Sequence, residues 1–250
     1  MKPKPYLREV SLKREKVSSY GKYPFSLPAV RALDSLIFHP DVTFIVGENG
    51  CGKSTLLEAI SIAWGFNPEG GTTNFNFSTR PSHSDLHEHI RLTKSFRRPS
   101  DGFFLRAESL FNLATDMERL DAEPSPAPPV VNSYGGRSLH EQSHGESFLS
   151  LLLHRFGGNG LYILDEPEAA LSPTRQLSAI RRIHQLVLMN SQFIIATHSP
   201  ILMAYPRAKI LLLDEVGFTE VDYEATEHYA VTKEFMNNPA RMVREVLRED

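Results

Sequence analysis

The stretch Gly47-Glu48-Asn49-Gly50-Cys51-Gly52-Lys53-Ser54-Thr55 matches the pattern G-x-x-x-x-G-K-[ST]. The β-branched run 41–46 before it predicts a buried strand, and apolar residues at helical spacing in 53–64 predict a helix directly after it. Glycines let consecutive backbone N–H groups turn toward one phosphate, and the positive end of the helix dipole adds to the attraction. We therefore expect a phosphate-binding loop, with Lys53 on the outer phosphates and the Ser54 hydroxyl on Mg²⁺.

The composition is that of an ordinary globular protein. The chain has 250 residues, of which 41% are hydrophobic and 23% charged, a length that fits one large domain or two small ones. No apolar run approaches the roughly 18–20 residues of a membrane span, and residues 1–16 lack the apolar centre of a signal peptide. The single cysteine excludes an internal disulfide, so we expect a cytoplasmic protein. A net charge of −3 gives no overall basic surface, so any contact with nucleic acid would be local.

Strands and helices alternate along the chain, which predicts an α/β fold with a mostly parallel sheet flanked by helices. The expected strands are 41–46, 102–106, 161–164, 192–196 and 209–213, and the expected helices are 53–64, 109–120, 146–156 and 172–190. Closely spaced prolines make 123–129 a stiff linker. We expect a single domain over 1–250: a nucleotide-binding core in 1–65 and 161–220 with a β-rich N-terminal part, a helical lobe in 66–160 and a C-terminal helical extension in 221–250.

Two carboxylates and a histidine follow predicted buried strands. Asp165 and Glu166 end the apolar run 161–164, and His198 follows the strand 192–196. Since ligands of open α/β sheets bind at the carboxyl ends of the strands, these side chains should meet the phosphate loop there. Asp165 would hold Mg²⁺, Glu166 would orient or deprotonate an attacking water, and His198 would donate to the γ-phosphate. The alternatives are an exposed acidic strand end and a surface histidine.

In order and spacing, these motifs resemble the ATP-binding-cassette (ABC) ATPases: Walker A at 47–55, Walker B at 161–166 and a histidine switch at His198. Ser143-His144-Gly145-Glu146-Ser147 resembles the signature motif of that class, commonly LSGGQ, and Ser143 lies 22 positions ahead of Asp165. The resemblance implies a RecA-like P-loop fold, ATP and Mg²⁺ as ligands, and hydrolysis to ADP and phosphate. It also implies that Ser143 and Gly145 face a γ-phosphate held by another subunit, so that two copies enclose two ATP molecules head to tail.

Within the class, the sequence after Asp165 is closer to a soluble branch, because Ser172 stands where transporter ATPases usually have Asp. That branch includes overcoming-lysogenization-defect (OLD) nucleases and small AAA-type ATPases related to DNA-repair and chromosome-maintenance (SMC) heads. Ser143 follows Thr55 by only 88 positions, too few for a long coiled coil, and the 52 residues after His198 leave no room for a nuclease domain. The resemblance therefore favours a stand-alone ATPase head without membrane insertion.

One departure from the class leaves the function open. The class normally has a glutamine between Walker A and the signature that contacts Mg²⁺, and no Gln occurs between Thr55 and Glu141. Glu108 is the candidate replacement as a Mg²⁺ ligand, or else an exposed acid at the start of a helix. Because a carboxylate repels phosphate, turnover would be slow. The alternatives to a working ATPase are an ATP-gated clamp or sensor that serves a separate nuclease, defence or DNA-repair effector, and the ATP-binding subunit of a transporter.

Weaker features have plain explanations as well. A metal site at His83, His87 and His89 is less favoured than a polar surface loop, because no single regular structure unites the three histidines. Tyr23 or Phe25 would stack on adenine or else pack in the core. A basic patch would touch nucleic acid or else form a solvated face; it comprises Arg91, Lys94, Arg97 and Arg98, with Phe96 among them. A C-terminal helix over 232–248 would dock a partner or pack on the domain.

Overall fold

A six-stranded sheet with the order β5-β6-β7-β3-β8-β9 forms the centre of the computed structural model. The structure describes residues 5–68, 70–72, 84–106, 110–122, 128–214 and 217–248. The strands are β3 (Val42–Gly47), β5 (Asp101–Arg106), β6 (Gly160–Asp165), β7 (Gln192–Ala196), β8 (Ala208–Leu213) and β9 (Phe218–Val221). All neighbours pair in parallel except β8 and β9. The predicted α/β fold with a mostly parallel sheet is confirmed.

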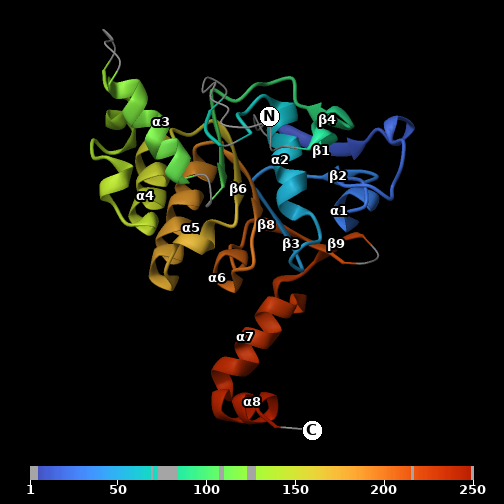
Figure 1. Ribbon diagram of the computed structural model, residues 1–250. Helices are drawn as coiled ribbons and strands as arrows, with labels where there is room; N and C mark the ends of the chain where they lie inside the picture. Colours follow the sequence, from blue (N-terminus) through green and yellow to red (C-terminus); the bar gives the residue numbers. More distant parts are fainter. Residues whose placement is uncertain are drawn as a thin grey trace.

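Helices cover one face of this sheet, and a helix with a small sheet covers the other (Figure 1). The first face carries α3 (Leu110–Ala122), α4 (His144–Ser150) and α5 (Pro173–Leu188); the second carries α2 (Lys53–Trp64). Successive strand residues alternate between the two cores: Phe103 and Tyr162 lie in the first, whereas Phe104 and Ile163 lie in the second. This alternation explains the near-continuous apolar runs of the central strands, because both faces of the sheet are buried.

An antiparallel sheet with the order β2-β1-β4 forms the N-terminal part. Its strands are β1 (Leu7–Leu12), β2 (Leu36–Ile37) and β4 (Ile90–Lys94), accompanied by the short helix α1 (Pro28–Arg31). The side chain of Gln192, at the start of β7, joins the two sheets. It accepts hydrogen bonds from the backbone N–H groups of Tyr6 and Leu7, each at 2.9 Å, and donates to the Leu7 carbonyl at 2.8 Å.

The segment 66–160 divides between the sheets and the helical face. Its strands β4 and β5 belong to the two sheets, and its helical part begins with α3. Short turns of 3-10 helix at Val130–Tyr134 and Leu139–Glu141 precede α4, and a π-helical turn at Leu151–Arg155 follows it. The helix predicted over 146–156 thus begins two residues earlier and ends in a π turn. Residues 123–127 of the predicted linker lie outside the described residues.

The C-terminal extension is a pair of helices that projects from the body of the protein (Figure 1). After α6 (Pro200–Met203) and β9 come α7 (Glu227–Asn237) and α8 (Pro239–Val246). The single helix predicted over 232–248 is wrong, because Pro239 has no N–H to continue α7 and Asn238 lies outside helical geometry, at φ −140°. Neither helix has a buried residue. In the described part of the chain, no helix is both long and apolar enough to cross a membrane.

Candidate nucleotide-binding site

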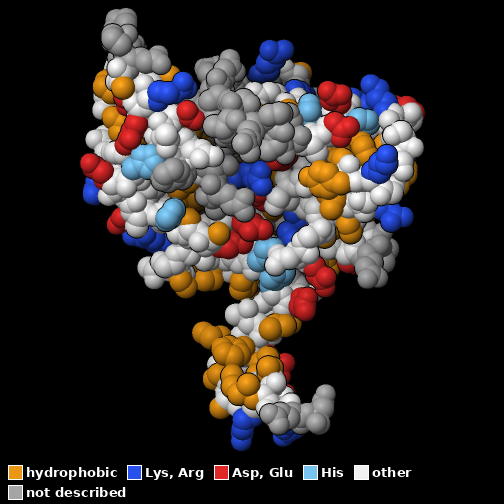
Figure 2. Space-filling model, in the orientation of Figure 1, with side chains coloured by type: hydrophobic (Ala, Val, Ile, Leu, Met, Phe, Trp, Pro, Cys, Tyr) orange, Lys and Arg blue, Asp and Glu red, His pale blue; other side chains and the backbone are white. Residues whose placement is uncertain are grey.

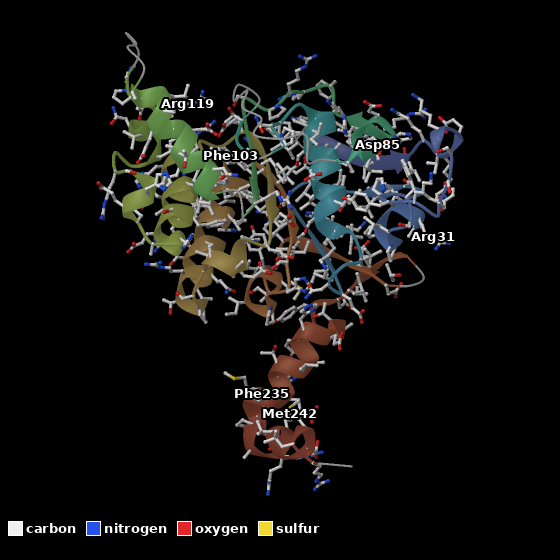
Figure 3. The ribbon with its side chains drawn as sticks, in the orientation of Figure 1. Arg31, Asp85, Phe103, Arg119, Phe235 and Met242 are labelled. Carbon is white, nitrogen blue, oxygen red and sulfur yellow. The ribbon has the colours of Figure 1, made fainter. Side chains whose placement is uncertain are left out.

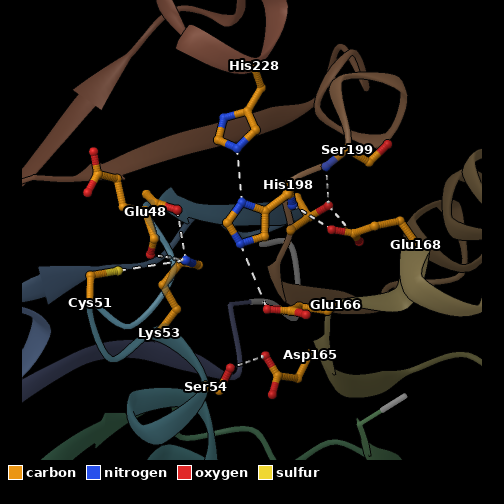
Figure 4. A network of polar contacts seen from close by, with 12 residues as sticks. Glu48, Cys51, Lys53, Ser54, Asp165, Glu166, Glu168, His198, Ser199 and His228 are labelled. Atoms are coloured by element: carbon orange, nitrogen blue, oxygen red, sulfur yellow. Dashed lines mark hydrogen bonds and ion pairs between the residues drawn. The ribbon is translucent and has the colours of Figure 1, made fainter. Parts of the chain in front are cut away.

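Three neighbouring strands bring the predicted site residues to one edge of the sheet. Strands β6, β7 and β3 lie side by side, and Ala196 at the end of β7 pairs with both Asp165 and Ile45. The loop after β3, the acidic pair after β6 and the segment after β7 therefore leave the sheet together. Figure 4 shows Lys53, Asp165, Glu166 and His198 gathered at this carboxyl edge. The order of the strands therefore brings these side chains to the same edge of the sheet.

The loop 47–55 closes around the ammonium group of Lys53. This buried lysine donates hydrogen bonds to the Gly47 carbonyl at 2.8 Å and the Glu48 carbonyl at 2.7 Å. A Cβ on Gly47 would lie 2.4 Å from the Leu213 carbonyl oxygen of β8, so the close approach of two backbones requires glycine there. Gly50 has φ +79° and an open surround, so it supplies the left-handed turn of the loop. Because α2 begins at Lys53, the positive end of its dipole faces the loop.

A cavity of about 900 Å³ lies beside the loop. Its walls come from the loop, from the end of β8, from His198 and from the first turn of α7. Cys51 also lines the cavity, and its side chain is buried, as expected for a small residue in the loop. The size of the cavity fits a small-molecule ligand, for which pockets of roughly 300–1,000 Å³ are usual.

Ser54 and Asp165 form the direct link between the loop and β6. The Ser54 hydroxyl donates to Asp165 Oδ1 at 3.0 Å, although the two residues are 111 positions apart. A hydroxyl and a carboxylate are hard oxygen donors, and Mg²⁺ is usually held by one or two carboxylates together with phosphate oxygens. The described residues contain no group of three or more His, Cys, Asp or Glu side chains that could enclose a metal by themselves. The donor set therefore fits Mg²⁺ shared with a phosphate ligand. Glu108, the third predicted metal ligand, lies outside the described residues.

The sequence reasoning missed two charged neighbours of this link. Arg106, which pairs with Asp165 across β5 and β6, has its Nε 3.5 Å from Asp165 Oδ2. Its Nη1 lies 2.7 Å from Glu58 Oε2 on α2. The predicted strand 102–106 ended at Arg106, so a parallel sheet places it at the same edge, and this signal was available in the sequence.

Glu166 has an unusual backbone conformation and a half-exposed side chain. Its φ is +50°, in the left-handed region that favours glycine and asparagine, and its N–H donates to the Ala196 carbonyl at 3.0 Å. Glu166 Oε1 lies 3.8 Å from His198 Nε2. The turn after β6 thus directs this carboxylate toward the histidine rather than back along the strand. The observed outlier is of the kind that persists at functional sites.

Glu168 holds the segment that carries His198. Its carboxylate accepts the His198 backbone N–H at 2.5 Å and the Thr197 hydroxyl at 2.8 Å. Burial raises the pKa of Glu168, whereas these hydrogen bonds lower it. Sequence reasoning did not assign this role, although Glu168 stands two residues after Glu166.

His228 reaches the site from α7. Its Nε2 lies 3.0 Å from His198 Nδ1, and the two rings are 5.1 Å apart (Figure 4). Burial lowers the pKa of His198, and the positive charge of Lys53 lowers it further. Burial lowers the pKa of His228 as well. The pair is therefore neutral near pH 7. No sequence pattern indicated His228, which lies 30 residues after His198 in the extension.

The structure does not bring the signature-like residues to the loop of the same chain. Ser143 caps α4: its hydroxyl donates to Glu146 Oε2 at 2.8 Å, and its backbone N–H donates to the same oxygen at 3.0 Å. The latter bond lowers the pKa of Glu146. A Cβ on Gly145 would lie 2.6 Å from the Ala170 carbonyl, so glycine is needed where α4 meets the turn after β6. Neither Ser143 nor Gly145 lines the cavity beside the loop.

The weaker candidates resolve into ordinary contacts. Nδ1 of His87 lies 3.1 Å from the Ser84 carbonyl, and Nδ1 of His89 lies 3.0 Å from the Asp85 carbonyl. His83 lies outside the described residues. Phe25 is buried and packs edge-on against His89, whereas Tyr23 is exposed and absent from the cavity lining.

The basic patch borders a hollow of its own, away from the phosphate loop. The ammonium group of Lys94 lies 4.4 Å from the centre of the Trp64 ring. A hollow of about 680 Å³ beside it is also lined by Phe96, Arg97 and Arg98.

Two family models match the chain, one on each side of the helical segment. Residues 25–103 match an AAA domain, and residues 129–204 match an AAA domain model whose description names the AbiEii toxin of a type IV toxin–antitoxin system. The first match includes the loop 47–55, and the second includes Asp165, Glu166 and His198. Both parts of the chain are therefore similar to AAA domains.

The curated relatives of this chain are distant and longer. It is 25% identical over 86% of its length to 34% of the macrolide export ATP-binding/permease protein MacB of Marinobacter nauticus. It is 25% identical over 70% of its length to 35% of the ribose import ATP-binding protein RbsA of Yersinia pestis. The chain thus spans about a third of the length of the curated relatives it matches.

A solved structure shares the fold over nearly the whole chain. An ATP-binding cassette of an ABC transporter, in its ADP conformation, superposes with a TM-score of 0.50 at 17% identity. The match covers 97% of this chain and 99% of that one. The likeness shows that the two chains share a fold.

Proposed function

We propose that this chain is an AAA-type ABC ATPase that binds ATP with Mg²⁺ at the loop 47–55 and hydrolyses it to ADP and phosphate. The observation that carries the proposal is the Ser54–Asp165 hydrogen bond, because it joins a phosphate-binding loop to a buried carboxylate at the carboxyl edge of the sheet. The names of MacB and RbsA, both ATP-binding proteins, support ATP as the nucleotide.

Each side chain of the site has a separate task in this proposal. Lys53 and the N–H groups of the loop bind the β- and γ-phosphates. Ser54 and Asp165 would hold Mg²⁺, which neutralises charge on the phosphate oxygens when bound. Glu166 orients the attacking water and accepts its proton, and His198 donates a hydrogen bond from Nε2 to the γ-phosphate.

Removing the Lys53 ammonium tests the binding half of the proposal. Lys53→Ala should weaken Mg-ATP binding about 10- to 100-fold, since a hydrogen bond to a charged group contributes roughly 1.5–3 kcal/mol. Isothermal titration calorimetry measures the dissociation constant. The matched control is Lys94→Ala, which removes a lysine from the hollow beside Trp64 instead. Equal affinity of wild type and Lys53→Ala would remove the loop from the nucleotide site.

The proposal includes ATP-dependent pairing of two copies. Ser143 is exposed at the N-terminus of α4, and its side chain makes hydrogen bonds with Glu146 and Arg175 of the same chain, so in this proposal it contacts phosphate across an interface. Two copies arranged head to tail would place Ser143 and Gly145 of each opposite the loop of the other.

Glu166→Gln tests the catalytic half and the pairing together. Losing the proton acceptor should slow phosphate release about 10²- to 10⁴-fold while ATP binding is kept, because general base catalysis contributes factors of this size. Trapped ATP should then raise the dimer fraction in size-exclusion chromatography with light scattering. Glu224→Gln, an exposed glutamate beyond β9, is the control. Undiminished phosphate release by Glu166→Gln would refute the role of Glu166, and a monomer at saturating ATP would refute the pairing.

An ATP-gated sensor is the second candidate, and the C-terminal extension favours it. Figure 2 shows hydrophobic side chains gathered on α7 and α8, away from the body of the protein. The exposed ones are Val231, Phe235, Met236, Val243, Val246 and Leu247. Figure 3 labels Phe235 on α7 and Met242 on α8, both in the projecting pair of helices. Such a surface fits contact with a separate effector. Tight ATP binding with turnover far below the roughly 1 s⁻¹ of ordinary enzymes would favour the sensor.

The names of the relatives favour a third candidate, the ATP-binding subunit of a transporter. In that case a membrane-spanning partner would be a separate part of the assembly. Recovery of the chain with a membrane fraction, released by detergent together with such a partner, would decide for it. Recovery in the supernatant with an effector protein would decide for the sensor.

A further inference from the structure

The contact between His198 and His228 connects the extension to the nucleotide site. His228 lies in the first turn of α7, and its Nε2 lies 3.0 Å from His198 Nδ1. Both rings line the cavity beside the phosphate loop (Figure 4). The contact therefore joins a helix outside the central sheet to the residue expected to face the γ-phosphate.

A hydrogen bond between two neutral imidazoles has a fixed requirement: one ring must donate and the other must accept. Burial lowers the pKa of both rings, and the charge of Lys53 opposes their protonation. Each ring therefore carries a single proton near pH 7. Either His198 donates from Nδ1, leaving its Nε2 bare, or His228 donates from Nε2 and His198 keeps its proton on Nε2.

The surroundings of His198 Nε2 decide between these two arrangements. This buried atom has no hydrogen-bond partner among the described residues, and Glu166 Oε1 lies 3.8 Å away. A bare Nε2 would direct a lone pair at a carboxylate, which is repulsive, whereas an Nε2–H group would be attracted to it. The proton therefore belongs on Nε2 of His198, and Nδ1 must accept from His228.

We propose that His228 is a positioning residue: its Nε2–H donates to His198 Nδ1 and thereby holds His198 in the tautomer that presents an N–H to the nucleotide. The contact of His198 with a nucleotide rests on the proposed function, whereas the position of the proton on Nε2 does not. It makes the first turn of α7 part of the site. Withdrawal of α7 would release His198 to the other tautomer, with an acceptor facing the γ-phosphate.

The tautomer of His198 is measured directly by ¹⁵N NMR. The full chain, labelled with ¹⁵N-histidine and held at pH 8 without nucleotide, gives imidazole nitrogen shifts that distinguish Nε2–H from Nδ1–H. Wild type should show His198 protonated at Nε2. A wild-type spectrum with the proton on Nδ1 overturns the proposal, and no variant has to fold for that result.

Two substitutions of His228 separate positioning from packing. In His228→Gln the side-chain amide still donates, so His198 should keep its proton on Nε2. In His228→Glu the carboxylate only accepts, so the proton should move to Nδ1. The signal of His184, which contacts the Tyr205 hydroxyl at 3.0 Å, is the internal control and should not change. Failure of His228→Glu to move the proton, in a variant with an unchanged His184 signal, overturns the proposal.

ATP turnover is a second measurement, and it tests the role of the tautomer in the reaction rather than the position of the proton. ATP hydrolysis by His228→Gln should stay within about threefold of wild type, and His228→Glu should lose at least tenfold, because loss of one donor to a developing charge costs about 10²–10³. If no variant and no wild type hydrolyses ATP, the proposed function fails while the NMR result stands. If both variants lose turnover equally although only His228→Glu moves the proton, the tautomer has no role in the reaction and the positioning role is refuted.

Discussion

The two ends of the central sheet use similar polar residues for different purposes. At the amino end, Asp101 of β5 accepts hydrogen bonds from Tyr162 at 2.7 Å, Arg155 at 2.9 Å and the Gly157 N–H at 3.0 Å. At the carboxyl end, Asp165 of β6 accepts from Ser54 at 3.0 Å, and the loop 47–55 that carries Ser54 also contributes residues to the lining of a cavity. Buried polar groups with protein partners stabilise the fold, whereas polar groups that converge on a cavity are available to a ligand.

The residues with positive φ also differ between the two ends of the sheet. Three residues other than glycine have positive φ in the described ranges: Asn159, Asn190 and Glu166. Both asparagines precede strands at the amino end, and asparagine tolerates this conformation. Glu166 is at the carboxyl end and does not gain that tolerance, so its conformation costs on the order of 1 kcal/mol or more. At the carboxyl end, the fold thus tolerates a destabilising backbone conformation that directs the Glu166 carboxylate toward His198.

The largest expected effect comes from exchanging the two aspartates for asparagine one at a time. Asp101→Asn should lower the free energy of unfolding by about 3 kcal/mol, because it leaves the half-buried Arg155 without its counter-charge. Its affinity for Mg-ATP should stay unchanged. Asp165→Asn should instead reduce turnover on the order of 100-fold or more, since the Mg²⁺ ligand is worth several kcal/mol in the reaction.

Urea unfolding and a phosphate-release assay measure these two effects on each variant. Arg106 keeps its ion pair with Glu58 in Asp165→Asn, so this variant should lose less stability than Asp101→Asn. The division between the ends of the sheet breaks down if Asp101→Asn alters nucleotide affinity, or if Asp165→Asn loses only stability.

A smaller effect compares two serines that both precede helices. Ser143 makes a reciprocal capping box with Glu146, whereas the side chain of Ser172 makes no capping hydrogen bond to α5. Ser143→Ala should therefore cost about 1 kcal/mol of stability, and Ser172→Ala should cost little. Thermal unfolding measures both. If the proposed pairing holds, Ser143→Ala should also weaken the ATP-dependent dimer, and the control Ser172→Ala should not.

The positions of the central strands and the loop could be predicted because each strand is a short apolar run with its own flanking signal. The runs ending at Val46, Leu164 and Ala196 are followed by functional residues, and parallel pairing then places those residues at one edge. Local patterns, in short, sufficed where the contact follows from strand direction.

The rest depends on contacts between distant segments. Nothing in the local sequence of His228 indicates that α7 returns to the end of β7, because the turn after β9 decides that path. Strand β4 pairs with β1 across the N-terminal part, which no local pattern in 90–94 revealed. Pro239 could have indicated the break between the two helices, but the helical periodicity on both sides favoured a single helix. The role of Glu108 is a prediction that the described residues do not test.

The smallest expected effect is the dependence of stability on pH at the carboxyl end. Burial lowers the pKa of His198 and His228 below their ordinary value of about 6.5, and Lys53 adds to the shift, whereas Glu166 and Glu227 act against it. The unfolded chain therefore binds more protons than the folded chain below that pH. The contribution of these two histidines to the free energy of unfolding should be constant above about pH 6.5 and should fall as the pH is lowered toward 5.

Two other buried carboxyl groups respond to pH in opposite senses. Asp101 has a pKa below its ordinary value, because hydrogen bonds and Arg155 outweigh its burial, so its contribution is lost only at more acidic pH. Glu168 has a raised pKa, so the folded state is stabilised relative to the unfolded chain when this carboxyl group takes up a proton. The double variant His198→Gln/His228→Gln removes only the histidine contribution, so its unfolding free energy should change less between pH 7 and pH 5.5 than that of wild type. Equal slopes for wild type and the double variant would mean that the two histidines have the same pKa in the folded and the unfolded chain. The contrast between the two ends of the sheet would then rest on geometry alone.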